Sequence, residues 1–449
     1  MALIISACVI LVLIFLGMSI PFCFLSGSLL FAVLSGESVG SYTATAFYAL
    51  NSFPLLAIPL FMIAGTLMEK SGIASTLVDL AEVMLRKVKG GMGASIPVVA
   101  CFFGALSGSG TATVTVLASM MAPRLKALGW DKRYLGALIA ASGPLGYMIP
   151  PNMNAIIFAS VSEASVAALF LATLIPGLMW AGLYILINRI VYTKWYHPTT
   201  SLPTASDATD KSQPENKARS PEGGSAKSMR QVLRGALPAF MMPVIIMGGI
   251  YGGVMTATEA GAVGCLYAVI VGIFIYKRLT LKGIFRSFIE TGSGLGAILI
   301  MFPMTLIFSR ILVVHGVPAM VTALITAIST NKFVVIFVID FIVLLAGFFL
   351  DAGILLLVFT PLLLPVATLV GISVTQLGVI MFVAVGIGTI TPPMAIGLFI
   401  AGKMVDVTIK EMIEPLIPFF LFGGVPILFL VSYVPVVSTF LPRLILGAY

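Results

Sequence analysis

Two stretches of this sequence match each other: Gly146-Tyr147-Met148-Ile149-Pro150-Pro151 and Gly388-Thr389-Ile390-Thr391-Pro392-Pro393, which lie 242 residues apart. The same offset relates three further pairs of helix-breaking residues, Pro123 and Pro365, Gly129 and Gly371, and Pro176 and Pro418. Proline removes a backbone N–H and clashes with the carbonyl four residues earlier, so each tandem pair predicts a broken helix with free carbonyls. The chain is therefore expected to consist of two halves built on one pattern.

Composition places these halves in a membrane. Hydrophobic residues make up 59% of the 449 residues and charged residues only 9%, whereas roughly a quarter of a soluble domain is charged. Apolar runs such as Leu3 to Phe22 and Phe333 to Leu350 supply spans of about 20 residues. Because the first run lacks a charged leading region and a cleavage site, we expect a span there and not a signal peptide.

The sequence lacks the motifs that are typical of several classes of function. The four cysteines show no CxxC spacing, the chain has only two histidines, and no Walker loop, HExxH motif or nucleophile elbow occurs. We therefore expect neither an enzyme nor a zinc site, a disulfide framework or a nucleic-acid partner. A membrane-embedded enzyme would need a catalytic pair at one depth, and only isolated acids are available.

Basic residues indicate the orientation, since cytoplasmic loops are enriched in Lys and Arg. With the N-terminus outside, the expected spans of the first half are 3–22, 24–46 and 51–68, and those of the second half are 236–253, 257–276 and 291–311. The apolar stretches 92–122 and 333–365 are then re-entrant hairpins entering from opposite sides. Only Arg310, Lys332 and Arg443 of the 25 Lys and Arg residues remain outside.

The predicted fold is an all-α membrane protein with two inverted repeats of about five spans each, re-entrant helical hairpins and Pro-broken helices, as in elevator-type ion transporters. Its expected segments are scaffold spans 1–70, an amphipathic arm helix 71–91, a core hairpin and broken helix 92–163, a return span 164–193, a cytoplasmic polar linker 194–235, scaffold spans 236–316, a second arm helix 317–332, a second hairpin and broken helix 333–412, and a final span with the C-terminal tail 413–449.

The amphipathic stretches and the polar linker each allow two interpretations. The amphipathic stretches 73–88 and 317–329 are either levers that join a fixed scaffold to a moving core or interfacial helices that only pack. The linker is rich in Ser, Thr, Pro, Lys and Glu, which predicts a flexible connection. It could instead be a docking segment.

The first hairpin contains Gly104-Ala105-Leu106-Ser107-Gly108-Ser109-Gly110-Thr111-Ala112-Thr113. Glycines and hydroxyls at this density are costly in lipid unless the backbone lines a polar cavity. Hydroxyl and carbonyl oxygens suit a small cation, and N–H groups at helix N-termini suit an anion. The alternative is a packing surface of small residues.

The second hairpin contains two acids, Asp340 and Asp351. An ionisable residue at membrane depth is a functional candidate. We favour Asp351 as part of a sodium site because it adjoins the glycine break at Gly353, whereas Asp340 fits a protonated or hydrogen-bonded structural residue. The broken spans offer carbonyls near 146–150 and 388–391, unless they are ordinary proline kinks.

Seven stretches resemble the large membrane subunit of tripartite ATP-independent periplasmic (TRAP) transporters, the family of the C4-dicarboxylate and sialic acid systems. They are Ala64-Gly65-Thr66-Leu67-Met68-Glu69-Lys70-Ser71-Gly72, Gly90-Gly91, Ser107-Gly108-Ser109, Leu145-Gly146-Tyr147-Met148-Ile149-Pro150-Pro151, Thr258-Glu259-Ala260, Leu350-Asp351-Ala352 and Ile390-Thr391-Pro392-Pro393. The resemblance implies a sodium-driven elevator-type importer in a bacterial inner membrane. Its implied partners are a small four-helix membrane subunit and a periplasmic substrate-binding protein, with lipid around it. The family usually has serine where this chain has Asn152, glycine where it has Ala395, and asparagines where it has Ala384 and Gly397.

The predicted function is the large permease subunit of a sodium-coupled, binding-protein-dependent importer of a small organic acid. The expected sodium ligands are Ser107, Gly108, Ser109, Gly146, Pro150, Asp351, Gly353, Gly388, Thr389 and Thr391, and the expected substrate contacts are Ser109, Gly110, Thr111, Asn152 and Asn154. A stand-alone sodium-coupled carrier of the dicarboxylate type is the main alternative. A passive channel would not need two inverted breaks.

Overall fold

The computed structural model describes residues 1–51, 53–85, 90–196 and 229–447. Within those ranges the regular structure is helical and contains no β-strand. Seven helical segments in the same ranges are long and apolar enough to cross a membrane. Together with the composition, they make the chain a multi-pass membrane protein.

The first half runs from three short helices to a long one. Its elements are α1 (Ala2–Phe15), α2 (Ile20–Ser35), α3 (Val39–Leu50), η1 (Phe53–Leu56), α4 (Ala57–Ser71), α5 (Ile73–Leu85), α6 (Gly91–Ser107), α7 (Gly110–Ala127), α8 (Lys132–Ser142), η2 (Gly143–Tyr147), α9 (Met153–Ser162), α10 (Val166–Val191) and η3 (Tyr192–Lys194).

The second half follows a similar order. Its elements are α11 (Met229–Tyr251), α12 (Ala257–Ile270), η4 (Val271–Ile275), α13 (Leu281–Val314), α14 (Val317–Ile328), α15 (Lys332–Gly347), α16 (Ala352–Leu369), α17 (Val374–Thr389), α18 (Ile396–Val405), α19 (Ile409–Phe419), η5 (Phe420–Gly424), α20 (Val425–Tyr433) and α21 (Val436–Leu446). The segments η4 and η5 are π-helical insertions within longer helices.

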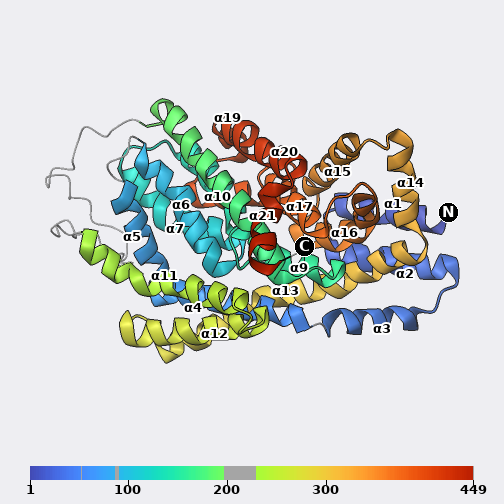
Figure 1. Cartoon of the computed structure of the whole chain (residues 1–449), viewed down its shortest axis with the longest axis horizontal. Coiled ribbons are helices and arrows are strands. Elements are labelled where there is room, and N and C mark those ends of the chain that lie inside the picture. The colour runs from blue at the N-terminus through green and yellow to red at the C-terminus, as the bar shows by residue number, and fades with distance from the viewer. Residues whose placement is uncertain (52, 86–89, 197–228, 448–449) are drawn as a thin grey trace.

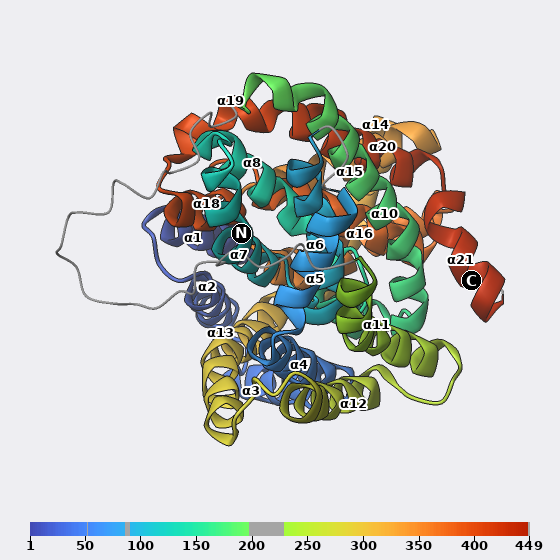
Figure 2. The same cartoon turned by 90° about the vertical axis from the view of Figure 1, so that its left-hand side faces the viewer.

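The helices form two groups. Helices α2, α3, α4, α11, α12 and α13, here called the long-helix layer, pack against one another along one side of the molecule (Figures 1 and 2). Helices α6–α9 and α15–α18, here called the hairpin bundle, lie on the other side, where α18 packs on α7 and α8 and α16 packs on α9. Elements from both halves of the chain therefore interlock inside the bundle.

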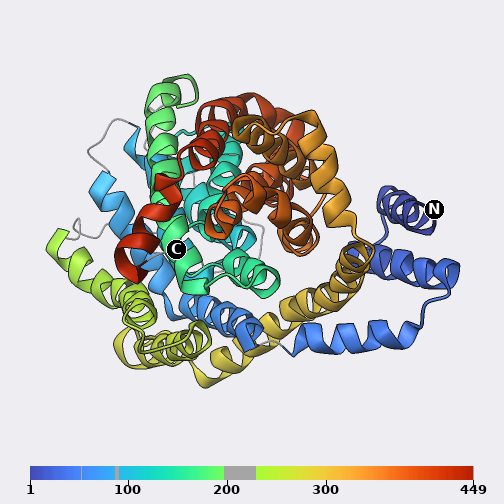
Figure 3. The ribbon, with the colours of Figure 1, turned by 45° about the vertical axis from the view of Figure 1, so that its right-hand side comes forward.

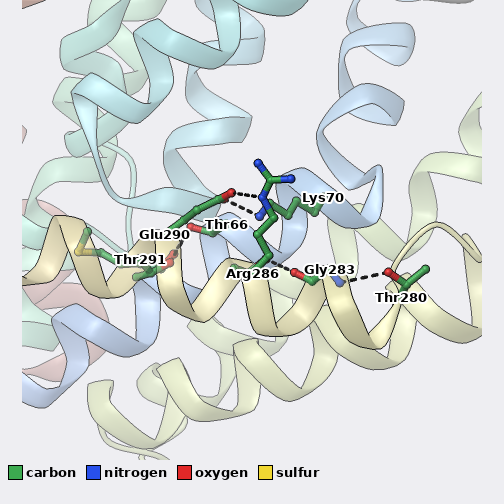
Figure 4. A network of polar contacts seen from close by, with 9 residues as sticks. Thr66, Lys70, Thr280, Gly283, Arg286, Glu290 and Thr291 are labelled. Atoms are coloured by element: carbon green, nitrogen blue, oxygen red, sulfur yellow. Dashed lines mark hydrogen bonds and ion pairs between the residues drawn. The ribbon is translucent and has the colours of Figure 1, made fainter. Parts of the chain in front are cut away.

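Helix α13 is the longest element and runs along α3 and α4 (Figure 3). Near one end, Glu290 pairs with Lys70 of α4 and with Arg286 of its own helix, with 2.8 Å between Arg286 Nε and the carboxylate (Figure 4). One turn before Lys70 on α4, the hydroxyl of Thr66 lies 3.0 Å from the hydroxyl of Thr291 on α13. These contacts fix the register of α13 in the long-helix layer.

Glycine contacts hold the hairpins against the broken helices. A Cβ added to Gly104 of α6 would lie 2.7 Å from the Cα of Gly146, and one added to Gly388 of α17 would overlap the backbone of Gly347 in α15. Side-chain-free backbones thus touch at corresponding places in the two halves. Each hairpin is thereby positioned by a helix of its own half.

Two expected boundaries were wrong. The expected span 3–22 is interrupted, because α1 ends at Phe15, Gly17 adopts a positive φ of 80° and α2 begins at Ile20. The polar linker was expected to reach residue 235, but α11 begins at Met229 and its apolar face packs on α5. The rest of the linker, 197–228, lies outside the described residues.

We expect Gly104→Ala to destabilise the fold, because the added methyl meets backbone that cannot rotate away. Overpacking of this kind costs about 1–3 kcal/mol. The thermal midpoint of the purified protein, measured by retention of the monodisperse peak, should fall. The control is Gly182→Ala in α10, where nothing lies within 4 Å of the added Cβ. A Gly104→Ala protein as stable as the control would contradict the contact.

Ala395 has φ 37° and ψ 46°, the left-handed region that favours glycine. That conformation costs a non-glycine residue about 1–2 kcal/mol, part of which glycine's greater freedom in the unfolded chain offsets. We expect Ala395→Gly to raise the thermal midpoint. Ala44→Gly, in the interior of α3 and on its exposed face, should lower it. A lower midpoint for Ala395→Gly would show that its side-chain packing outweighs backbone strain.

Candidate functional site

A cavity of about 240 Å³ lies where the hairpins, the broken helices and the long-helix layer meet. The layer contributes apolar side chains from α4 and α13, and the bundle contributes polar groups. The lining residues are Ile58, Gly108, Ser109, Gly110, Thr111, Tyr147, Met153, Asn154, Ile157, Ile298, Met301, Asp351, Ala352, Gly353 and Thr389. The cavity therefore has one apolar wall, and all of its polar groups lie on the opposite wall, where they are mixed with apolar side chains such as Ile157.

The first hairpin turns at Gly108, between α6 and α7. Gly108 has φ 60°, and a Cβ there would lie 2.7 Å from the carbonyl oxygen of Pro151, so the turn requires glycine. Ser109 caps α7: its hydroxyl accepts from the N–H of Ala112 at 3.4 Å and lies 3.2 Å from the hydroxyl of Thr111. These constraints place two hydroxyls on the cavity wall.

The second hairpin turns just before Asp351, which caps α16. One carboxylate oxygen accepts from the N–H of Gly353 at 3.2 Å. Asp351 is 242 residues after Ser109, so corresponding positions cap the second helix of each hairpin. Asp351 is the only charged side chain among the described residues that line the cavity.

The two broken helices meet through their side chains. The hydroxyl of Tyr147, at the end of η2, lies 3.0 Å from the hydroxyl of Thr389 at the end of α17, and these two residues are also 242 apart. The peptide bonds Pro150–Pro151 and Pro392–Pro393 are both cis. After each proline pair, a backbone N–H donates a hydrogen bond to a hairpin. Met153 donates to the carbonyl of Gly108 at 3.2 Å, and Met394 donates to the carbonyl of Phe348 at 3.3 Å.

Three helix N-termini converge on the cavity. Its wall includes first-turn residues of α7 (Gly110, Thr111), of α9 (Met153, Asn154) and of α16 (Ala352, Gly353). The first N–H groups of a helix have no partner within it and carry partial positive charge, so this wall suits an anion. The buried amide nitrogen of Asn154 also has no hydrogen-bond partner among the described residues.

The structure brings many of the predicted site residues to this cavity. Gly108, Ser109, Gly110, Thr111, Asn154, Asp351, Gly353 and Thr389 all line it. Their predicted division between sodium and substrate stays a prediction.

The other predicted residues are not among those that line the cavity. The buried Asn152 caps α9 by accepting from the N–H of Ala155 at 2.8 Å, and its amide lies 3.3 Å from Thr173. Thr391 donates to the carbonyl of Ile387 at 2.7 Å. The remaining four are packed against neighbouring backbone or buried: Ser107 against Gly65, Gly146 against Gly104, Gly388 against Gly347, and Pro150 in its cis pair.

Sequence reasoning missed Tyr147 and the apolar wall from α4 and α13. Tyr147 was detectable, because it occupies the position equivalent to Thr389 in the repeated motif. Ile58, Ile298 and Met301 carry no such signal, since an apolar residue in a span is ordinary. Asp340 lies elsewhere: it is buried in α15 and accepts from the hydroxyl of Ser432 at 2.8 Å.

Comparison with known proteins identifies the family. Residues 7–437 match the family model described as "Tripartite ATP-independent periplasmic transporter, DctM component". The sialic acid TRAP transporter large permease protein SiaM of Vibrio cholerae is 30% identical, with 97% of each chain covered. The C4-dicarboxylate TRAP transporter large permease protein DctM of Pseudomonas aeruginosa is 29% identical, with 93% of each covered.

Two further proteins support narrower statements: one is longer than this chain, and the other shares the fold alone. The isethionate TRAP transporter permease protein DctMQ of Oleidesulfovibrio alaskensis is 31% identical over 91% of this chain, which spans 61% of that protein's length. The crystal structure of the YdaH transporter of Alcanivorax borkumensis has a similar fold, with a TM-score of 0.57, 13% identity and coverage of 88% and 87%. The fold, the cavity and the family match agree: this chain belongs to the DctM-component family of tripartite ATP-independent periplasmic transporters.

Proposed function

We propose that this protein is the large permease subunit of a sodium-coupled importer of a small organic acid, located in a bacterial inner membrane. The observation that carries the proposal is the cavity, where three helix N-termini meet a single carboxylate. The relatives are named as transporter permeases, for isethionate, C4-dicarboxylates and sialic acid. Each of those compounds is an organic acid.

The charges of the cavity support coupling to a cation. No Lys or Arg lines it within the described part of the chain, and Asp351 contributes a negative charge. An anion about 5 Å from an ionised carboxylate is repelled by about 3 kcal/mol at an effective dielectric constant near 20. A co-bound cation removes that repulsion and gains from both charges.

Sodium fits the ligands better than a transition metal does. Hydroxyls of Ser109, Thr111 and Thr389 and the carboxylate of Asp351 are hard oxygen donors. Among the residues that the structure describes, no group of three His, Cys, Asp or Glu side chains gathers. In the transport cycle, sodium would bind first and neutralise Asp351, so that the partial positive charges of the helix N-termini could attract the organic acid.

The two halves are proposed to be inverted repeats that move as an elevator. In support, the pairs Ser109 and Asp351, Tyr147 and Thr389, and Gly146 and Gly388 share one offset and occupy corresponding places around the cavity. The hairpin bundle would slide along the long-helix layer, with α5 and α14 as arms. The apolar wall from Ile58, Ile298 and Met301 would be the surface that it passes.

The proposed partners are a small four-helix membrane subunit and a periplasmic substrate-binding protein, as the names of the relatives as TRAP permeases support. A stand-alone carrier is the second candidate. Omitting the binding protein from proteoliposomes distinguishes them: uptake should stop under the proposal and persist for a stand-alone carrier.

The coupling ion is tested in proteoliposomes that contain the permease with its two partners. We expect an inward sodium gradient to drive accumulation of the organic acid without ATP, since the cavity needs an added cation. An equal potassium gradient is the control. Undiminished uptake in sodium-free buffer with a proton gradient alone would overturn sodium coupling.

Asp351→Asn should separate the charge from the helix cap, because asparagine caps a helix N-terminus about as well as aspartate. Interactions of a charged group are worth about 1.5–3 kcal/mol, so we expect sodium affinity in uptake assays to fall about tenfold to hundredfold. The thermal midpoint should stay near that of the unmodified protein. Asp340→Asn is the matched control, since the carbonyl oxygen of the new amide can still accept from Ser432. Unchanged sodium dependence in Asp351→Asn would remove Asp351 from the ion site.

A further inference from the structure

A second hollow lies on the same seam between the long-helix layer and the hairpin bundle. Its volume is about 320 Å³, and α3, α9, α13 and α16 line it. We call it the vestibule and define it by Thr45, Tyr48, Val161, Ser309, Arg310 and Pro361. Arg310 also lines an adjoining hollow of about 400 Å³ between α3 and the end of α13. The guanidinium therefore borders two open spaces.

The vestibule continues the line of the central cavity. On α9, Ile157 lines the cavity and Val161 lines the vestibule, which is about 6 Å further along the helix. On α13, the corresponding residues are Met301 and Leu306, about 7.5 Å apart along the axis. One to two helical turns thus separate the two spaces.

Arg310 has no counter-charge within the part of the chain that the structure describes. Across residues 1–51, 53–85, 90–196 and 229–447, no hydrogen bond or ion pair of its guanidinium is seen. The acid of the adjoining hollow, Glu37, is already engaged: its two oxygens lie 2.9 Å from the hydroxyl of Tyr42 and 2.9 Å from His315 Nε2. An arginine on a spanning helix without a paired acid is a functional candidate.

The chemistry of Arg310 complements that of the central cavity. A guanidinium binds a carboxylate through two parallel hydrogen bonds, and Tyr48 lines the same space. The hydroxyls of Thr45 and Ser309 already donate to the carbonyls of Ser41 and Leu357. The central cavity has no Lys or Arg among its described lining residues. Under the proposed function it depends on bound cations for positive charge. The predicted orientation puts this end of α13 outside. An incoming organic acid would then meet this fixed positive charge before it reaches the central cavity.

We propose that Arg310 is an anion-capture residue, which binds the acid group of the incoming organic anion in the vestibule before it moves to the central cavity. The inference rests on the proposed function for the direction of travel. The binding step itself does not require sodium.

Binding is tested on the isolated protein in nanodiscs, with succinate as the carboxylate probe, without sodium and at low ionic strength. We expect succinate to raise the thermal midpoint of the unmodified protein, and chloride at equal ionic strength to leave it unchanged. Arg310→Gln should weaken succinate binding at least about tenfold, the effect of losing roughly 1.4 kcal/mol. Arg310→Lys should retain part of it. The matched control is Lys332→Gln, which removes a half-buried cation that contacts the carbonyl of Gly371.

Uptake by the reconstituted transporter gives the second measurement. In Arg310→Gln, KM for the organic acid should rise at low salt, kcat should stay within about twofold, and the dependence on ionic strength should flatten. Suppose instead that Arg310→Gln needs more binding protein for the same uptake rate while succinate binding is unchanged. Arg310 would then contact a carboxylate of the binding protein, and the proposal would be overturned. It would also be overturned by no sodium-free binding by the unmodified protein, or by identical binding by Arg310→Gln. Absence of sodium-driven uptake in the unmodified transporter would count against the proposed function alone.

Discussion

The close backbone contact between each hairpin and the broken helix of its own half is the constraint on which the rest of the structure depends. Gly104 meets Gly146 and Gly388 meets Gly347 so closely that a Cβ on Gly104 or on Gly388 would overlap the facing backbone. The breaks expose peptide groups, which are costly at membrane depth unless protein satisfies them. The hydrogen bonds from Met153 to Gly108 and from Met394 to Phe348 do so at both sites. Hairpins held this closely can present their ends to a common cavity.

Much of the fold was predictable because glycine and proline have strong local effects. The repeated motifs predicted both breaks, and the apolar stretches placed by the basic residues predicted both hairpins. Helices α6–α7 and α15–α16 lie within a few residues of the expected ranges. The ends of apolar helices were less predictable. The turn at 16–19 interrupts a continuous apolar run, and the polar beginning of α11 is helical because the helix packs on α5. Tertiary contacts determine where such helices begin and end, and the hydropathy of the sequence does not reveal those contacts.

The site was predictable in position and less so in detail. Ser109, Asp351 and Thr389 reach the cavity because each lies at a break whose type the sequence reveals. Asn152 belongs to the same motif, yet its side chain caps α9 and its polar groups are engaged there. A motif therefore identifies the backbone near a site, while the direction of each side chain depends on the helix that starts beside it. Arg310 was noticed only as an exception to the charge asymmetry, because its meaning depends on the hollows beside it.

The two halves share a backbone plan but not its chemistry. At the equivalent capping positions, the first half has the hydroxyl of Ser109 and the second half has the carboxylate of Asp351. Two identical halves would give two identical ion sites with the anion midway between them. Under the proposed function, with the charge on one side only, cations would be favoured near α16. The anion would be favoured near the N-termini of α7 and α9, where no carboxylate among the described lining residues opposes the helix dipoles. Under the same proposal, this asymmetry would give the cavity a polarity, and a bound organic acid would have one preferred orientation.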